Sequence, residues 1–137
     1  DALFANASGD ALDLYGRIIG EKRGGLDDLF YRNVIVARSL ANQSRGTPDD
    51  MIHVLQVLAP SNAAVKHENL YPASCLFTVT TDKRPDPQYL ARVGVIMRAA
   101  KPAGISFGGV WAVRIPFGFA TNPDILGYNL GRLAFTF

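Results

Sequence analysis

The fold is decided by the stretch Leu14-Tyr-Gly-Arg-Ile-Ile-Gly-Glu-Lys-Arg-Gly-Gly-Leu-Asp-Asp-Leu-Phe-Tyr-Arg32, continued by Ala37-Arg-Ser-Leu-Ala-Asn-Gln-Ser-Arg-Gly-Thr-Pro-Asp-Asp50. Glycines punctuate it at two joints, and the segments between the joints have helical patterning. It contains no obvious catalytic residue. The stretch therefore predicts three helices, and it points to a part of an assembly rather than to a catalyst.

The first helix is predicted over residues 10–19, because apolar residues recur there at helical spacing and Gly20 supplies a stop. These apolar residues are Leu12, Tyr15, Ile18 and Ile19. A charged, flexible joint follows at residues 21–25. The second helix begins at Asp27 or Asp28, whose carboxylate can accept hydrogen bonds from the first free amides of the helix.

The second helix is expected to be amphipathic. Arg32 and Arg38 fall away from its apolar side, which predicts a packed inner face and a charged outer face. The apolar side consists of Leu29, Val34, Ala37, Leu40 and Ala41. After Gly46, the third helix is predicted over residues 48–58, because Thr47 is a cap residue and proline and two carboxylates occupy the first turn.

The second half of the chain changes character. Residues 63–70 and 74–81 predict two antiparallel strands joined by a turn at 71–73. A fourth helix is predicted over residues 88–101, with Leu90, Val93, Ile96, Met97 and Ala100 on one side, and a third strand over residues 105–115. The expected fold is α+β: a three-helix region and a small, mainly antiparallel β-β-α-β sheet with one packed helix.

The chain is expected to divide into three segments that together form one compact domain. They are a helical region over residues 1–60, a small α+β region over 61–116 and an irregular arm over 117–137. The arm is rich in glycine and aromatic residues, which must dock on this domain or on another chain. Both alternatives remain open for its aromatic residues, Phe117, Phe119, Tyr128, Phe135 and Phe137.

The sequence shows no pattern typical of a disulfide, a metal site or a catalytic site. The single cysteine, Cys75, excludes an internal disulfide, and neither His53 nor His67 has the spacing of a metal site. We therefore predict no catalytic residue, cofactor or metal. The pairs Asp27-Asp28 and Asp49-Asp50 could suggest a glycosidase, but both stand at helix starts, where capping and the helix dipole explain them.

Nucleic acid is the strongest competing partner. Basic residues concentrate in the N-terminal third, and three short helices invite comparison with a helix-turn-helix. The net charge is only +2, however, and the acidic residues from Asp10 to Asp50 share that part of the chain, which argues against a continuous positive face. The basic residues are Arg17, Lys22, Arg23, Arg32, Arg38 and Arg45.

The order of several short motifs resembles a family of small, formerly uncharacterised bacteriophage tail proteins, encoded among the baseplate genes of contractile-tailed phages and phage-like particles. The motifs are Leu12-Asp-Leu-Tyr-Gly-Arg-Ile-Ile-Gly-Glu, Arg23-Gly-Gly-Leu-Asp-Asp, Tyr31-Arg, Ala37-Arg-Ser-Leu-Ala-Asn, Arg45-Gly-Thr-Pro-Asp-Asp, Arg98-Ala-Ala-Lys-Pro-Ala-Gly-Ile, Phe117-Gly-Phe and Gly127-Tyr-Asn-Leu-Gly-Arg. They span most of the chain, and their specificity lies in their order.

The resemblance implies a structural baseplate wedge component, present in the virion tail and made and assembled in the host cytoplasm. Its partners would be other wedge, hub or sheath-proximal tail proteins, in several symmetry-related copies. A structural role implies no small-molecule substrate. No membrane contact is expected either, because no apolar run is long enough to span a bilayer. The alternatives are a nucleic-acid-binding module and a subunit of a tail-associated cell-wall hydrolase.

The residues expected to contact partner proteins combine the helix surfaces with the arm. Apolar and aromatic groups would provide contact energy, and arginines would fix the register between subunits. The predicted interface residues are Tyr15, Arg32, Arg38, Phe117, Phe119, Tyr128, Phe135 and Phe137.

Overall fold

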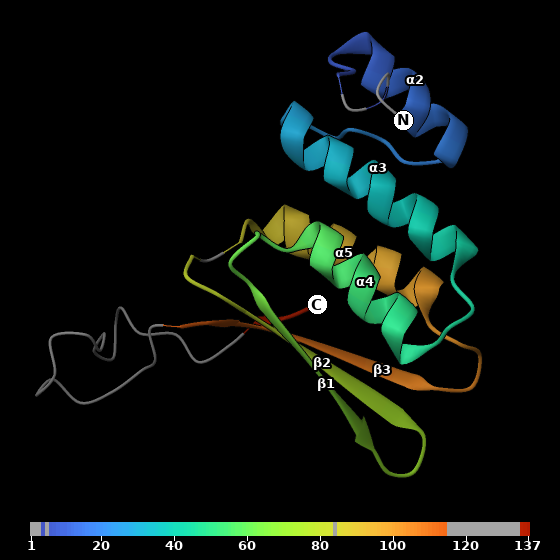
Figure 1. Cartoon of the computed structure of the whole chain (residues 1–137), viewed down its shortest axis with the longest axis vertical. Helices are drawn as coiled ribbons and strands as arrows, with labels where there is room; N and C mark the ends of the chain where they lie inside the picture. The colour runs from blue at the N-terminus through green and yellow to red at the C-terminus, as the bar shows by residue number, and fades with distance from the viewer. Residues whose placement is uncertain (1–3, 5, 84, 115–134) are drawn as a thin grey trace, which may run out of the picture.

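The computed structural model describes residues 4, 6–83, 85–114 and 135–137, and its fold is α+β (Figure 1). The elements are α2 (Asp10–Ile19), α3 (Asp28–Gln43), α4 (Pro48–Leu58), β1 (Ala64–Leu70), β2 (Ser74–Thr81), α5 (Pro87–Ala100), β3 (Ser106–Val113) and β4 (Phe135–Thr136). These helices and the first three strands were all predicted, and the predicted boundaries differ from the observed ones by no more than two residues; for α3 only the start was predicted. The predicted interface residues Phe117, Phe119 and Tyr128 lie outside the described residues.

Most of the helices begin and end at the capping and stop residues from which their ends were predicted. At the end of α2, Gly20 adopts a left-handed conformation with φ of 84°, and its N–H donates to Gly16 O. At the start of α4, the Thr47 side chain accepts a hydrogen bond of 3.2 Å from the N–H of Asp50. The prediction for α3 is wrong in one respect: Asp27 occupies the cap position, but its side chain caps no amide.

The sheet is mixed, with strand order β1-β2-β3-β4. β1 and β2 form the predicted antiparallel hairpin, whereas β2 and β3 pair in parallel over eight positions, from Ser74 with Ser106 to Thr81 with Val113. Parallel neighbours require a crossover, and α5 provides it. The C-terminal residues were predicted to be irregular, but Phe135–Thr136 form β4 and pair antiparallel with β3.

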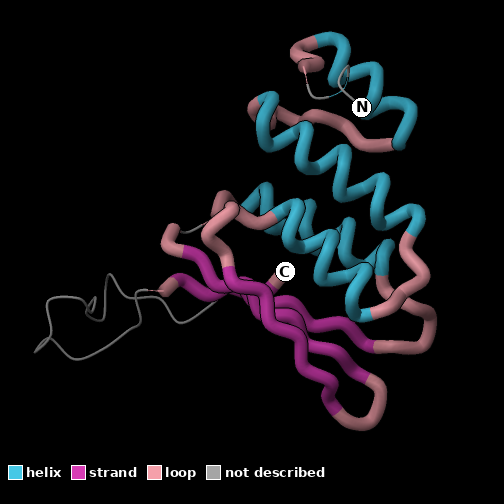
Figure 2. Tube along the Cα trace, in the orientation of Figure 1, coloured by secondary structure: helices cyan, strands magenta, loops and turns pink. Residues whose placement is uncertain are grey.

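The described helices lie on one side of the sheet (Figure 2). α4 and α5 cover the sheet, α3 packs on both of them, and α2 packs on α3 at the far end of the molecule (Figure 1). The main core lies between the first two layers. Its largest fully buried side chains include Trp111, Phe77, Met51, Leu55, Ile96 and Met97.

The surface of α3 differs from the predicted division into a packed face and a charged face. Leu29, assigned to the apolar side, is 58% exposed, whereas Tyr31 and Ile35 are buried. Arg32 and Arg38 are half-buried rather than solvent-facing, and Arg32 Nη2 donates to Ala7 O at 2.6 Å. The reason is that α3 is covered twice, by α4 and α5 on one side and by α2 on the other. A sequence pattern that assumes one buried face of a helix therefore assigns the residues of a second buried face wrongly.

Candidate functional site

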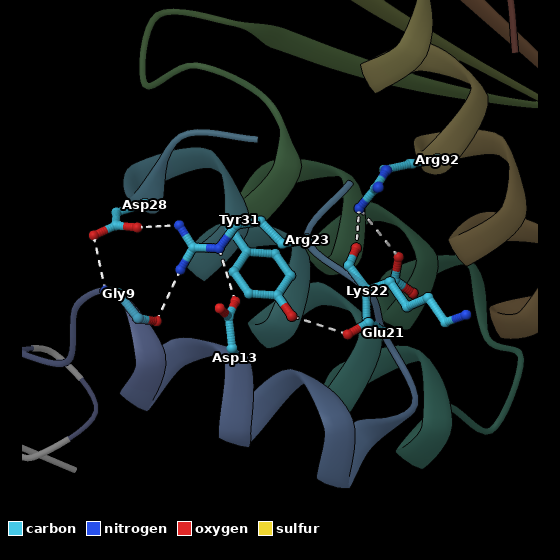
Figure 3. A network of polar contacts seen from close by, with 8 residues as sticks. All are labelled: Gly9, Asp13, Glu21, Lys22, Arg23, Asp28, Tyr31 and Arg92. Atoms are coloured by element: carbon cyan, nitrogen blue, oxygen red, sulfur yellow. Dashed lines mark hydrogen bonds and ion pairs between the residues drawn. The ribbon is translucent and has the colours of Figure 1, made fainter. Parts of the chain in front are cut away.

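Arg23 fixes the loop of residues 21–27, which connects α2 to α3 (Figure 3). Its Nε atom lies 2.7 Å from Asp13 Oδ1, Nη1 pairs with Asp28 Oδ1, and Nη2 donates to Gly9 O at 2.9 Å. The guanidinium also lies 4.9 Å from the centre of the Tyr31 ring, which is cation–π distance. One side chain therefore joins both helices to the segment that precedes α2.

Two further contacts connect this loop to the rest of the chain. The Tyr31 hydroxyl donates to Glu21 O at 2.9 Å, and Arg92 of α5 donates to Lys22 O. Arg92 Nη1 also lies 3.5 Å from the Glu21 carboxylate, and both side chains are largely buried. The joint that the sequence predicted to be flexible is thus held from three helices (Figure 3).

Acidification is expected to weaken the docking of α2. The hydrogen bond from Arg23, and then that from the Gly9 N–H, lower the pKa of the Asp28 carboxyl below its ordinary value of 3.8. The stabilisation is therefore complete above about pH 5 and is lost as the pH falls through the lowered pKa. Thermal denaturation measured between about pH 6 and pH 2 should show a loss that Asp28→Asn reduces.

The matched control for this measurement is Asp49→Asn, because Asp49 is exposed on α4 and takes part in none of the ion pairs between described residues. This variant should follow the wild-type pH curve. Equal curves for wild type and Asp28→Asn would contradict the assignment of acid sensitivity to Asp28.

The fixed loop forms one wall of a groove of about 660 Å³, which we call the helix-end groove. It lies where α3 and α5 begin and α4 ends, at the left of Figure 1. Its described lining is Gly25, Leu26, Asp27, Leu29, Phe30, Asn33, Leu58, Ala59, Pro60, Ser61, Lys83, Pro85, Asp86, Tyr89 and Trp111. Three helix ends and three loops thus converge on one largely apolar concavity.

The floor of the groove is rigid. The Tyr89 hydroxyl donates to Leu58 O at 2.6 Å and so satisfies a carbonyl in the last turn of α4. Burial raises the pKa of Tyr89, which keeps the phenol protonated as a donor. Trp111 Nε1 donates to Thr81 Oγ1 at 2.8 Å, so both aromatic side chains are fixed by packing and by a hydrogen bond.

The wall of the groove exposes apolar surface. Leu29 and Phe30 are 58% and 48% exposed, although Phe30 also makes an edge contact with Tyr89 at 5.6 Å between ring centres. The rim carries the charged side chains of Asp27, Lys83 and Asp86. An apolar centre with a polar rim is the usual anatomy of a protein-binding surface.

A second hollow, of about 350 Å³, lies beside the β1–β2 turn and the start of α4 and includes His67 and Cys75 in its lining. His67 Nε2 is buried without a hydrogen-bond partner among the described residues. Burial raises the pKa of the Cys75 thiol, which disfavours the thiolate that nucleophilic chemistry requires. Among the described residues, no three His, Cys, Asp or Glu side chains are grouped to hold a metal.

The predicted interface residues that the structure describes do not gather in one place. Tyr15 is half-buried against Phe4, with ring centres 5.1 Å apart, and the two arginines lie on α3 as described above. Phe137 packs on the sheet, 6.0 Å from Trp111 and 6.1 Å from Phe107 between ring centres. Phe135 pairs through its backbone with Trp111.

The groove residues Leu29 and Phe30 were missed as candidates for partner contact. A signal was present in the run Leu29-Phe-Tyr31, because three consecutive large apolar residues cannot share one face of a helix. Tyr31 is buried between α3 and α2, so its two predecessors face elsewhere. The sequence does not show that α4 and α5 place a concave wall opposite them.

A scan of the chain against protein-family models finds no match, and a search of curated proteins finds none either. Among the described residues, the helices are all too short or too polar to span a lipid bilayer. Function therefore has to be inferred from the sequence resemblance and from the geometry of the described residues.

Proposed function

We propose that this protein is a non-enzymatic structural subunit of the baseplate of a contractile phage tail or phage-like particle. It holds neighbouring wedge proteins together by inserting their apolar side chains into the helix-end groove. The observation that carries the proposal is the exposure of Leu29 and Phe30 beside the fixed aromatic floor of that groove. The order of sequence motifs supports the baseplate as the setting.

The internal engagement of arginines favours this proposal over nucleic-acid binding. Arg23 pairs with two aspartates, Arg92 with a glutamate, and Arg32 with a backbone carbonyl. These side chains act in packing and are not available for phosphate contacts. A hydrolase also gains no support, since Asp50 Oδ2 accepts a hydrogen bond of 3.0 Å from the Arg45 N–H in the cap of α4.

The direct test is quantitative mass spectrometry of purified tail particles. The copy number of this chain should stand in a fixed ratio to the sheath and tube proteins that matches the rotational symmetry of the tail. Absence of the chain from clean particles would reject the structural role, and salt-dependent DNA binding would then be measured.

Disrupting the groove is expected to reduce assembly without unfolding the chain. The double substitution Leu29→Ser and Phe30→Ser removes two exposed apolar anchors, which should lower incorporation into particles by roughly 30-fold if the pair contributes about 2 kcal/mol. The control is Val95→Ser on α5, because Val95 is similarly exposed at 55% but lies outside the described groove lining.

Circular dichroism should give the same helical content for both variants and wild type. Normal incorporation of the Leu29→Ser, Phe30→Ser chain would show that the groove is not where neighbouring subunits bind.

A further inference from the structure

α2 has a second apolar side that the described part of the chain leaves exposed. The helix packs on α3 at the end of the molecule remote from the sheet (Figure 1). Its inner side carries the buried residues Leu12 and Gly16. Among the described residues α3 covers only one side of α2, which leaves the opposite side exposed to solvent and accessible to another chain.

Three residues form an apolar row on that open side, which we call the outer stripe: Ala11, Leu14 and Ile18. All are exposed, Leu14 to 54% and Ile18 to 74%. Their spacing of three and four residues places them in line along one face of the helix. This spacing is the one through which two helices pack side by side.

Two exposed charged residues flank the outer stripe. Asp10 and Arg17 are exposed, and neither takes part in the ion pairs between described residues. At about 100° per residue, both fall on the same edge of the stripe, one near each end of α2. A helix with a negative N-terminal end and a positive C-terminal end on one edge complements a copy of itself that runs in the opposite direction.

We propose that the outer stripe is a self-association surface, on which α2 of a second copy of this chain packs antiparallel across a two-fold axis. The axis passes beside Leu14, so that Leu14 meets its own equivalent. Ala11 then lies opposite Ile18 of the second copy, which matches a small side chain with a large one.

The charges select the antiparallel direction. In that arrangement Asp10 of each copy lies beside Arg17 of the other, which gives two equivalent ion pairs, one at each end of the contact. A parallel pair would instead place the charged edges of the two copies on opposite flanks of the contact, where neither Asp10 nor Arg17 would meet its counterpart. The same row of apolar residues therefore specifies one partner and one direction.

Self-association through α2 is independent of the proposed role in a tail. The helix-end groove is lined by residues from position 25 onward, and the outer stripe is confined to α2. One chain can accordingly hold a second copy through α2 and a different protein through the groove.

The register can be tested by disulfide trapping in the full chain. Leu14→Cys should oxidise to a covalent dimer, because the axis brings the two positions within the roughly 7 Å between Cα atoms that a disulfide allows. Ile18→Cys should not cross-link to itself, since its copies stand about 10 Å apart along the helix axes. A mixture of Ala11→Cys and Ile18→Cys chains should cross-link to each other.

Controls are provided by the wild-type chain, whose single cysteine Cys75 is buried, and by Val95→Cys, which is equally exposed on α5. Both should migrate as monomers on a denaturing gel run without reducing agent, because neither can form the disulfide at the two-fold axis. Cross-linking of Leu14→Cys at the rate of Val95→Cys would overturn the proposal.

The charge pairing has a separate test by sedimentation velocity. Asp10→Lys and Arg17→Glu should each weaken self-association about tenfold, because each change places like charges together at both ends of the contact. An equimolar mixture of these two variants should recover association. In the mixed dimer the introduced lysine of one chain faces the introduced glutamate of the other, while the native pair forms at the other end. Failure of the mixture to associate more strongly than either variant alone would exclude the antiparallel arrangement.

Discussion

Replacing Trp111 with alanine is expected to lower the free energy of unfolding by about 3–5 kcal/mol, the usual cost of removing a buried tryptophan or phenylalanine side chain from a core. Trp111 is 1% exposed and belongs to the cluster that joins the sheet to α4 and α5. A domain of this size is stable by only about 5–15 kcal/mol, so the variant would approach the threshold of unfolding.

Two further variants serve as comparisons, one that keeps an aromatic ring at position 111 and one that changes an exposed side chain. Trp111→Phe keeps an aromatic ring but removes the donor to Thr81 Oγ1, and it should cost about 1–2 kcal/mol. Val95→Ala removes methyl groups from an exposed side chain and should change stability by less than about 0.5 kcal/mol. Urea denaturation followed by circular dichroism measures all three. A Trp111→Ala curve coincident with that of Val95→Ala would show that the indole does not stabilise the core.

Gly16→Ala is expected to detach α2 from α3 at a net cost of about 1–3 kcal/mol, the sum of overpacking and a lost hydrogen bond less the gain in helix propensity. A Cβ atom at this position would lie 1.7 Å from the Tyr31 hydroxyl and 2.7 Å from Glu21 O, so both the ring and the loop would have to move. Overpacking of this kind costs about 1–3 kcal/mol, and the displaced Tyr31 loses its hydrogen bond. The better helix propensity of alanine returns only about 1 kcal/mol.

A second substitution should relieve this clash. Tyr31→Phe removes the oxygen nearest to the added methyl group, so the double variant should be less destabilised than the sum of the two single variants. Gly20→Ala serves as the comparison, because Gly20 needs a positive φ but has open space around its Cβ position, and strain alone should cost about 1–2 kcal/mol. Hydrogen exchange of the α2 amides measures local release, and unchanged protection in Gly16→Ala would contradict the steric argument.

The sequence predicted the elements well because their boundaries depend on local chemistry. Thr47 and Pro48 begin α4, Gly20 ends α2, and the apolar spacing in α5 corresponds to the residues that are buried. Each of these signals acts over one or two turns of chain. They require no knowledge of what the element packs against.

The failures concern the arrangement of elements in space. Leu29 was assigned to the apolar side of α3 but is exposed, and Ile35, which was not assigned to that side, is buried because α3 is covered from two sides. Asp27 or Asp28 was expected to cap α3, but neither does, and Asp28 instead pairs with Arg23 and accepts a hydrogen bond from Gly9 N–H, 19 residues earlier in the chain. The helix-end groove is formed by segments from four parts of the chain, and no local pattern specifies their convergence.

The parallel pairing of β2 with β3 is also expected to set the order of events during folding. The α3–α4 pair and the β1–β2 hairpin close over short connections, but the contact between Ser74 and Ser106 encloses the whole of α5. Closing a longer loop costs more chain entropy, and packing of α5 must offset that cost before the strands can register. Trp111, Phe107 and the edge that receives β4 all belong to β3, so we expect the floor of the groove to be completed late, after the helices that border it have formed.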